Sequence, residues 1–358
     1  MRIREQVPLA ERTTLGVGGK AEYLLDANEE PDLIEALAWA DRHRVACRIL
    51  GGGSNVVIAD AGFDGLVIQI ASRGVSWETH PDRVEVTAAA GEAWDALVAE
   101  SVRLGYSGLE CLSGIPGQVG ATPIQNVGAY GQEVADHIVR VRAFDRQLGR
   151  TVVLPAAECG FGYRDSRFKS GEPDRFVVLD VTFRLGADGR AKPRYAQLRR
   201  HLDARGVPAP TVRDVRESVL AIRRDKSMLA DPDDPNGRSC GSFFVNPVVA
   251  ADFAAHATRE FCEAPSYPQP DGRVKLAAAW LIEQAGFQRG HRQGRAGLSA
   301  RHALALVAHA GATAGDIVAL ARSIRAAVQT RFGIRLMPEP AFWGFASLDD
   351  GLPDDRLA

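Results

Sequence analysis

The sequence contains few of the features that mark secreted, metal-binding or membrane proteins. Only five of its 358 residues are cysteines. They are scattered, odd in number and without a C-x-x-C pair: Cys47, Cys111, Cys159, Cys240 and Cys262. This pattern argues against a disulfide scaffold and against a structural zinc site. Buried free thiols in a reducing compartment are the simpler interpretation.

Long apolar segments are also missing. No run of about 18 apolar residues occurs, so we expect no membrane-spanning helix. The first residues carry the charges of Arg2, Arg4 and Glu5, and no apolar core of a signal peptide follows them. Together these absences predict a cytoplasmic protein that does not act in a membrane.

Neither sign of charge dominates the chain. The 43 basic residues nearly match the 45 acidic ones, and the formal net charge is −2. This balance gives no electrostatic case for nucleic acid or an anionic membrane as the main partner. The basic pairs Arg199-Arg200 and Arg223-Arg224 are typical of solvated helix faces.

What the sequence does contain is enough apolar material for more than one core. Hydrophobic residues make up 46% of the chain, and its length fits two or three domains. In the first third, short apolar strands alternate with an amphipathic helix that places Leu33, Leu37 and Ala40 on one face. The pattern predicts an α+β fold. The proline-rich segment 231–237 predicts a domain boundary.

The rest of the pattern predicts further strands and helices. Thr211 and Asp214 have the spacing of a capping box at the start of a helix. We expect strands at 22–25, 48–50, 56–58, 66–70, 84–87, 138–144, 152–154, 176–185 and 302–307, and around Ser242 and Glu339. We expect helices at 32–43, 92–104, 195–202, 211–226, 252–261, 275–284 and 313–332.

Two glycine-rich segments are candidates for phosphate binding, because glycine lets backbone N–H groups approach a phosphate closely. The first, 50–55, follows an apolar strand but lacks the G-x-G-x-x-G pattern, so a simple turn is the alternative. The second, 113–131, adds the amides Gln118, Gln125 and Asn126, and an ordinary long loop is its alternative. The presence of both segments favours a cofactor site.

Three other segments offer groups for chemistry. Arg164 is a guanidinium among aromatic residues in 161–168, and it suits an anion. Ser242 is a hydroxyl between a glycine and two phenylalanines, and Glu339 is a carboxyl between two prolines. Each has an ordinary alternative: a stacked surface arginine, a strand edge and an exposed glutamate. Their joint occurrence favours one active site assembled from distant segments.

These motifs, in this order, resemble those of the UDP-N-acetylenolpyruvoylglucosamine reductase family, flavoenzymes of peptidoglycan precursor synthesis. The resemblance rests on 49–55, 113–131, 161–168, 238–247 and 336–340 and covers nearly the whole chain. It implies noncovalently bound FAD, NADPH as hydride donor and a monomer. It also implies an FAD-binding domain of the vanillyl-alcohol oxidase type in two subdomains, 1–70 joined by 339–358 and 71–228. A C-terminal α+β substrate-binding domain would span 229–338.

The resemblance also implies roles for the three chemical groups. Hydride would pass from flavin N5 to the methylene carbon of the enolpyruvyl group, and charge would develop on the adjacent carbon and its carboxylate. Arg164 would stabilise that charge, and electrostatic stabilisation is usually the largest catalytic contribution. Glu339 would help if it stays protonated or positions a partner. Ser242 would protonate the carbon, with help from its neighbours because serine is a weak acid.

Further contacts follow from the resemblance. Tyr195 matches the tyrosine that closes over the substrate phosphate in the longer subtype of the family. Tyr130 has core packing as its alternative, and Lys275 has a solvated helix start. The implied substrate contacts are Tyr130, Tyr195, Arg223, Lys226, Asn246 and Lys275. The implied cofactor contacts are Leu50, Gly51, Gly52, Gly53, Ser54, Asn55, Ser113, Ile115, Gly117, Gly120, Ala121, Thr122, Gln125, Asn126, Gly128 and Ala129.

Two rival functions remain open on the sequence. The first is an FAD-dependent oxidase of the same flavin-domain class that acts on an alcohol or a sugar. The second is a flavin- or nucleotide-binding module without catalysis. The segments around Ser242 and Glu339 argue against both.

Overall fold

The computed structural model describes residues 2–253 and 264–345. Their contacts divide the chain into two compact units. Unit 1 comprises residues 1–7, 21–53 and 64–230, and unit 2 comprises residues 8–20, 54–63 and 231–358. The boundary after Ala230 falls at the start of the expected linker. The division of the chain into three domains stays a prediction.

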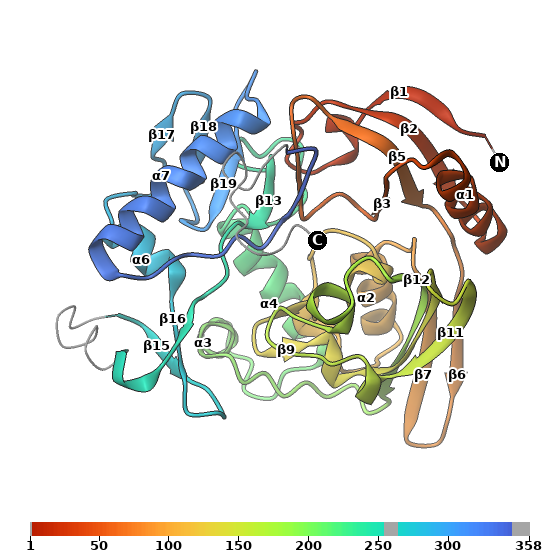
Figure 1. The fold of residues 1–358 in the computed structure, drawn as a ribbon. Helices are drawn as coiled ribbons and strands as arrows, with labels where there is room; N and C mark the ends of the chain where they lie inside the picture. The colour runs from red at the N-terminus through yellow and green to blue at the C-terminus, as the bar shows by residue number, and fades with distance from the viewer. Residues whose placement is uncertain (1, 254–263, 346–358) are drawn as a thin grey trace. The chain divides into compact units, whose positions relative to one another are not determined.

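Unit 1 contains a four-stranded sheet covered by one helix (Figure 1). The strand order is β1 (Arg4–Pro8), β2 (Lys20–Ala27), β5 (Phe63–Ile70) and β3 (Cys47–Leu50). Helix α1 (Glu30–His43) begins with a capping box between Glu29 and Asp32 and ends at Arg44 in the left-handed conformation. Its buried face, which includes Leu33 and Leu37, joins the unit 1 core.

The second sheet of unit 1 has five antiparallel strands, in the order β11 (Arg150–Pro155), β10 (Ile138–Asp145), β12 (Phe176–Gly186), β7 (Arg83–Ala89) and β6 (Val75–Thr79). Helices α2 (Trp94–Arg103), α3 (Ala196–Ala204) and α4 (Val212–Asp225) complete the unit. The expected capping box of α4, Thr211 with Asp214, is confirmed. A second, smaller hydrophobic core of unit 1 lies between α3 and α4, around Leu198, Leu202 and Val219.

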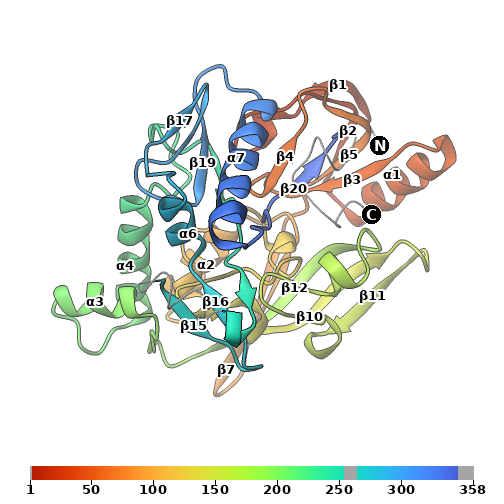
Figure 2. The same ribbon diagram turned by 60° about the vertical axis from the view of Figure 1, so that its left-hand side comes forward.

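In its described residues, unit 2 consists mainly of short strands and helices (Figure 2). One sheet has the order β13 (Ser239–Ser242), β19 (Ala305–Ala308), β18 (Ala296–Leu298) and β17 (Arg292–Gln293). A second has the order β14 (Val248–Val249), β16 (Val274–Leu276) and β15 (Ser266–Pro268). Strands β4 (Val56–Ile58) and β20 (Ala341–Trp343) pair in parallel. Helices α6 (Ala278–Gln284) and α7 (Ala314–Phe332) pack into the hydrophobic core of unit 2.

Single helical turns and one small hairpin connect these elements. The hairpin consists of β8 (Gly128–Ala129) and β9 (Gln132–Glu133). The turns are η1 (Ala10–Arg12), η2 (Glu110–Leu112), η3 (Val119–Ala121), η4 (Val134–Asp136), η5 (Ala156–Glu158) and the π-helical η6 (Arg167–Gly171).

The pattern-based elements agree with the structure in most places. Three differ. Lys275 lies in strand β16, and the helix expected at 275–284 begins only at Ala278. The strand expected at 302–307 is Ala305–Ala308. The segment 113–131 contains η3 and β8. Most of the helix expected at 252–261 lies outside the described residues.

Two expectations from the composition can be compared with the structure. Cys47, Cys111, Cys159 and Cys240 are buried free thiols, as expected, and Cys262 lies outside the described residues. Within 2–253 and 264–345, no helix has both the length and the apolar character needed to cross a membrane.

Candidate active site

The two glycine-rich segments meet backbone to backbone in unit 1. A Cβ atom at Gly52 would lie 2.7 Å from Cα of Gly117, which is closer than real Cβ contacts come. Gly117 itself has φ +117°, a backbone conformation that favours glycine. A Cβ at Gly51 would lie 3.4 Å from Oε1 of Gln118. The glycines therefore allow two loops, distant in sequence, to lie directly against each other.

Gln118 leaves an acceptor without a donor beside these loops. Its Nε2 donates to the carbonyl of Ile70 at 3.1 Å, while its buried Oε1 has no hydrogen-bond partner in the part of the chain that the structure describes. Buried polar atoms are rarely left unsatisfied, because desolvation is costly. A bound group with an N–H or O–H donor fits this position. Gln118 is one of the amides of the second glycine-rich segment, but it is not among the cofactor contacts expected from the sequence.

Several residues expected to contact a cofactor use their side chains to shape the second loop. Ser113 Oγ donates to Glu110 O at 2.6 Å, and Thr122 Oγ1 donates to Val119 O at 2.8 Å. The nearly fully buried Asn126 donates to Glu133 and Gly162 and accepts from Ala135. The side chains of these three residues therefore hold the loop in shape.

The other expected cofactor contacts differ in packing, backbone conformation and burial. A Cβ at Gly120 would lie 2.5 Å from Cβ of Ala90, so this glycine is needed for packing. Gly53 has φ +63°. Leu50, Ile115 and Ala129 are buried or pack against the buried core, Ala121 is exposed, and Ser54 and Gln125 are half-buried.

The hairpin β8–β9 presents Tyr130 at its tip. Tyr130 and Gly131 have φ +49° and +82°, as in a type I′ turn, which is unusual for tyrosine. The Tyr130 ring meets the ring of Tyr195 edge-on, with centroids 5.7 Å apart. Lys226 Nζ lies 5.9 Å from the centroid of the Tyr130 ring. Burial raises the pKa of Tyr130.

Arg164 occupies a strained tight turn. The backbones of Gly162 and Asp165 exchange two hydrogen bonds, and Arg164 between them has φ +54°. Such a conformation costs a non-glycine residue about 1–3 kcal/mol and is found mainly at functional sites. The guanidinium donates from Nη2 to Gly128 O at 2.5 Å and from Nη1 to Asn126 O at 3.4 Å. Arg164 therefore lies against the end of the second loop.

Arg223 holds the start of the same loop. It is 7% exposed and donates from Nε to Gly114 O at 3.1 Å and from Nη2 to Met228 O at 2.6 Å. Lys226 Nζ donates to Gln197 Oε1 at 2.7 Å. Burial lowers the pKa of Lys226, and the Arg223 charge lowers it further. Two partly desolvated cations beside two tyrosine rings form a corner suited to an anion.

In unit 2, backbone pairing places Glu339 opposite Phe243, the residue that follows Ser242. The Glu339 N–H donates to Phe243 O at 2.8 Å, and Phe244 pairs with Pro338 in an antiparallel bridge. Burial, with a smaller effect of the Glu339 carboxylate, raises the pKa of Cys240 to about 12. Asn55 Nδ2 donates to Glu339 O at 3.3 Å, and Asn55 O accepts from Ala341 N–H at 3.0 Å. Asn55 thus ties the first loop to Glu339.

The remaining expected substrate contacts in unit 2 have structural roles. Asn246 Oδ1 accepts from the N–H of Ala278, the first residue of α6, at 2.9 Å. Lys275 lies in the central strand β16, where it pairs with Val248 on one side and Tyr267 on the other. The expected solvated helix start at Lys275 is therefore wrong.

Unit 1 also contains a cavity of about 490 Å³. Its lining includes Glu30, Ser72, Arg73, Arg142 and Asp180, and it includes none of the expected site residues. Three of these charges are already paired, because Arg142 bonds both Glu30 and Asp180. No residue of the two glycine-rich loops lines this cavity.

Comparisons with known proteins agree with this geometry. Residues 21–154 match a family described as FAD binding domain, and residues 231–343 match one described as UDP-N-acetylenolpyruvoylglucosamine reductase, C-terminal domain. A protein named UDP-N-acetylenolpyruvoylglucosamine reductase from Thermobifida fusca is 49% identical over 94% of this chain and 97% of its own. One of the same name from Saccharopolyspora erythraea is 48% identical over 93% of each chain.

A solved structure is similar over the same extent. The crystal structure of UDP-N-acetylenolpyruvylglucosamine reductase from Thermus caldophilus covers 96% of this chain and 100% of its own, with a TM-score of 0.65 and 27% identity. The expected α+β fold, with an FAD-binding domain followed by a C-terminal domain of this reductase type, is confirmed.

Proposed function

The chain belongs to the UDP-N-acetylenolpyruvoylglucosamine reductase family of FAD-binding oxidoreductases, and we propose that it reduces UDP-N-acetylenolpyruvoylglucosamine to UDP-N-acetylmuramate with NADPH in peptidoglycan precursor synthesis. The observation that supports the proposal is the backbone pairing in unit 2 that places Glu339 opposite Phe243, the residue after Ser242. Ser242 and Glu339 thus supply a hydroxyl and a carboxyl on two paired segments, and the adjacent Phe243 and Phe244 are buried.

The residues of the two glycine-rich loops fit FAD. The backbones at Gly52 and Gly117 approach too closely for a Cβ at Gly52, which brings the two loops together, and Gln118 Oε1 offers an unsatisfied acceptor. Gly51, Gly52, Gly53, Gly117 and Gln118 would hold the cofactor noncovalently. When bound, FAD supplies the two-electron chemistry that accepts hydride from NADPH and passes it to the methylene carbon.

Arg164 would bind the carboxylate of the enolpyruvyl group. A guanidinium remains charged at every physiological pH and can bond a carboxylate through two N–H groups. Since negative charge grows on this carboxylate during reduction, a cation already in place stabilises the transition state more than the substrate. The fixed turn around Arg164 supports this role, because preorganisation avoids a reorganisation cost during the reaction.

Ser242 would deliver the proton to the carbon next to the ether oxygen. Its place in strand β13 is set by backbone pairing with Ala305, so its hydroxyl has a defined position. Glu339 would act next to it, either as a protonated acid or by orienting the hydroxyl. General acid catalysis of this kind typically contributes about 10²–10⁴-fold.

The corner formed by Arg223, Lys226, Tyr130 and Tyr195 would bind the diphosphate of the nucleotide. Lys226 supplies a cation, which Gln197 holds by a hydrogen bond, and Tyr195, which is 40% exposed, supplies a hydroxyl. Asn246 and Lys275 remain proposed substrate contacts.

Product analysis tests the proposed function. The FAD-loaded protein is incubated with NADPH and UDP-N-acetylenolpyruvoylglucosamine, and UDP-N-acetylmuramate is quantified by mass spectrometry against NADPH consumed. We expect a ratio of one product to one NADPH. Oxygen consumption with alcohols or sugars, and no product, would favour the rival oxidase. Flavin binding without any turnover would favour the binding module. A monomer and a cytoplasmic location stay predictions.

A further inference from the structure

The turn that carries Arg164 is joined to the π-helical turn η6 that follows it. Lys169, within η6, donates from Nζ to the backbone carbonyl of Arg164 at 3.0 Å. The bond holds the peptide on the C-terminal side of a residue with φ +54°. A strained conformation of this kind persists only when its surroundings fix it from several sides. Lys169 is one of these restraints.

Ser166 joins the same turn to the second glycine-rich loop. Its hydroxyl accepts from Phe168 N–H at 3.2 Å, which caps η6, and donates to Ile124 O at 2.5 Å. The residue is 2% exposed. From the other side, Asn126 of that loop donates to Gly162 O at 2.9 Å, and Arg164 donates back to Asn126 O and Gly128 O. Loop and turn therefore form one hydrogen-bonded body.

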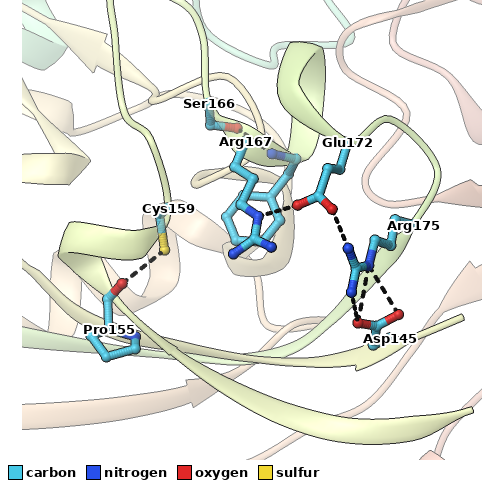
Figure 3. A network of polar contacts seen from close by, with 8 residues as sticks. Asp145, Pro155, Cys159, Ser166, Arg167, Glu172 and Arg175 are labelled. Carbon is cyan, nitrogen blue, oxygen red and sulfur yellow. Dashed lines mark hydrogen bonds and ion pairs between the residues drawn. The ribbon is translucent and has the colours of Figure 1, made fainter. Parts of the chain in front are cut away.

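A chain of ion pairs anchors this body to the five-stranded sheet (Figure 3). Glu172 bonds Arg167 at the start of η6 and also bonds Arg175. Arg175 in turn donates to the buried carboxylate of Asp145 at 2.7 and 3.0 Å. Asp145 ends strand β10. The π-helical turn is thus fixed at both ends, and a π turn inserted at a functional site is a recurrent feature of proteins.

We propose that Ser166 and Lys169 are positioning residues for Arg164, which hold its guanidinium against the second loop in the orientation that receives a ligand carboxylate. The proposal rests on the proposed function of Arg164. Neither residue needs to touch the substrate. Loss of either would let the turn relax towards an ordinary backbone conformation and would misplace the guanidinium, while the anion corner at Lys226 would stay intact.

Binding measurements on the oxidised, FAD-loaded protein test this without turnover. Isothermal titration calorimetry compares UDP-N-acetylmuramate, which carries a carboxylate, with UDP-N-acetylglucosamine, which does not. The variants are Ser166→Ala, Lys169→Met and Arg164→Ala. Ser170→Ala is the matched control, because Ser170 is an exposed serine in the same turn. Thermal unfolding of each variant reports its overall stability.

We expect Ser166→Ala and Lys169→Met to weaken the binding of UDP-N-acetylmuramate about tenfold. The affinity for UDP-N-acetylglucosamine should change by less than about twofold. In an Arg164→Ala background, Ser166→Ala should cause no further loss, because its effect acts through Arg164. Equal losses for both ligands, or an additive loss in the double variant, would overturn the proposal.

The outcome also separates this inference from the proposed function. If Arg164→Ala weakens only the carboxylate ligand while Ser166→Ala and Lys169→Met leave both ligands unchanged, only the positioning role is wrong. If the wild-type protein binds neither ligand, or if Arg164→Ala changes neither affinity, the proposed function of Arg164 is wrong and the inference falls with it.

Discussion

The proposed catalytic groups of unit 1 and those of unit 2 are held in place by different means. In unit 1, Arg164 depends on side chains: its guanidinium bonds two loop carbonyls, and Lys169 bonds its own carbonyl. In unit 2, Ser242 and Glu339 depend on backbone pairing between neighbouring segments. Side-chain substitutions should therefore displace Arg164 easily, whereas substitutions of Ser242 or Glu339 should remove a chemical group without moving the backbone.

The largest effect is expected for Ser242→Ala. Alanine keeps the register of β13, so FAD binding and reduction by NADPH should match the wild type. Reoxidation by UDP-N-acetylenolpyruvoylglucosamine should slow by about 10²–10⁴-fold, because the proton donor is missing. Anaerobic stopped-flow absorbance measures both steps separately. Reoxidation at the wild-type rate would remove Ser242 from the role of proton donor.

The contact between the glycine loops can be broken at one position and spared at its neighbour. In Gly52→Ala the new Cβ would overlap the Gly117 backbone, whereas in Gly51→Ala its nearest neighbour would be 3.4 Å away. We expect Gly52→Ala to weaken FAD by about 100-fold or more, corresponding to about 2.7 kcal/mol, and Gly51→Ala to weaken it less. Flavin fluorescence titration of the apoprotein gives both affinities. Equal affinities in the two variants would contradict the loop geometry.

The stability of the protein as a function of pH tests whether a charged side chain holds the second glycine-rich loop in unit 1. Asp95 accepts from Gly114 N–H at 2.6 Å and from both Nη atoms of Arg216. Burial works to raise the pKa of Asp95, but the Arg216 and Gly114 hydrogen bonds outweigh it and lower the pKa. A carboxyl whose pKa is lower in the folded state stabilises the fold at pH values above its pKa in the unfolded state, which is ~3.9. This stability is lost as the pH falls through the pKa of the folded state.

Asp95→Asn should therefore reduce the free energy of unfolding by about 1 kcal/mol at neutral pH, a value kept small because the Asp95 side chain is 39% exposed. In urea unfolding, the difference in the free energy of unfolding between the variant and the wild type should disappear below the ordinary carboxyl pKa. Glu100→Gln, which breaks an exposed pair with Arg103 on the same helix, is the control and should have a smaller effect. A difference that stays constant down to acidic pH would mean that Asp95 does not hold Gly114 through its charge.

The smallest effect is expected for Tyr195→Phe. The ring contact with Tyr130 remains, and only the hydroxyl is lost. KM for UDP-N-acetylenolpyruvoylglucosamine should rise by about three- to tenfold with little change in kcat, since a single hydrogen bond typically contributes about 0.5–1.5 kcal/mol net. Steady-state kinetics measures this. An unchanged KM would remove Tyr195 from the site.

Local patterns predicted the elements but not the contacts between them. The periodicity around Leu33 and the capping box at Thr211 are short-range signals, and both helices are present. The helix expected from Lys275 failed because a run of alanines hides where strand β16 ends. The pairing of Phe244 with Pro338 joins distant segments, and no local pattern encodes it.

The residues of the proposed site can be selected from the sequence, but the contacts that support them cannot. Arg164, Ser242 and Glu339 stand out by their chemistry among aromatic and proline neighbours. The positive φ of Arg164 has no sequence signal, because the position is not a glycine or an asparagine. Likewise, the bond from Ser166 to Ile124 and the orphan oxygen of Gln118 depend on how two loops pack in three dimensions.

The central claim is that one protein carries electrons from NADPH to an enolpyruvyl nucleotide sugar. An anaerobic flavin spectrum tests it most directly. The FAD-loaded protein is first bleached with one equivalent of NADPH, and UDP-N-acetylenolpyruvoylglucosamine is then added without oxygen. The account predicts rapid return of the oxidised flavin absorption in proportion to the substrate added. A spectrum that stays bleached until oxygen is admitted would contradict it.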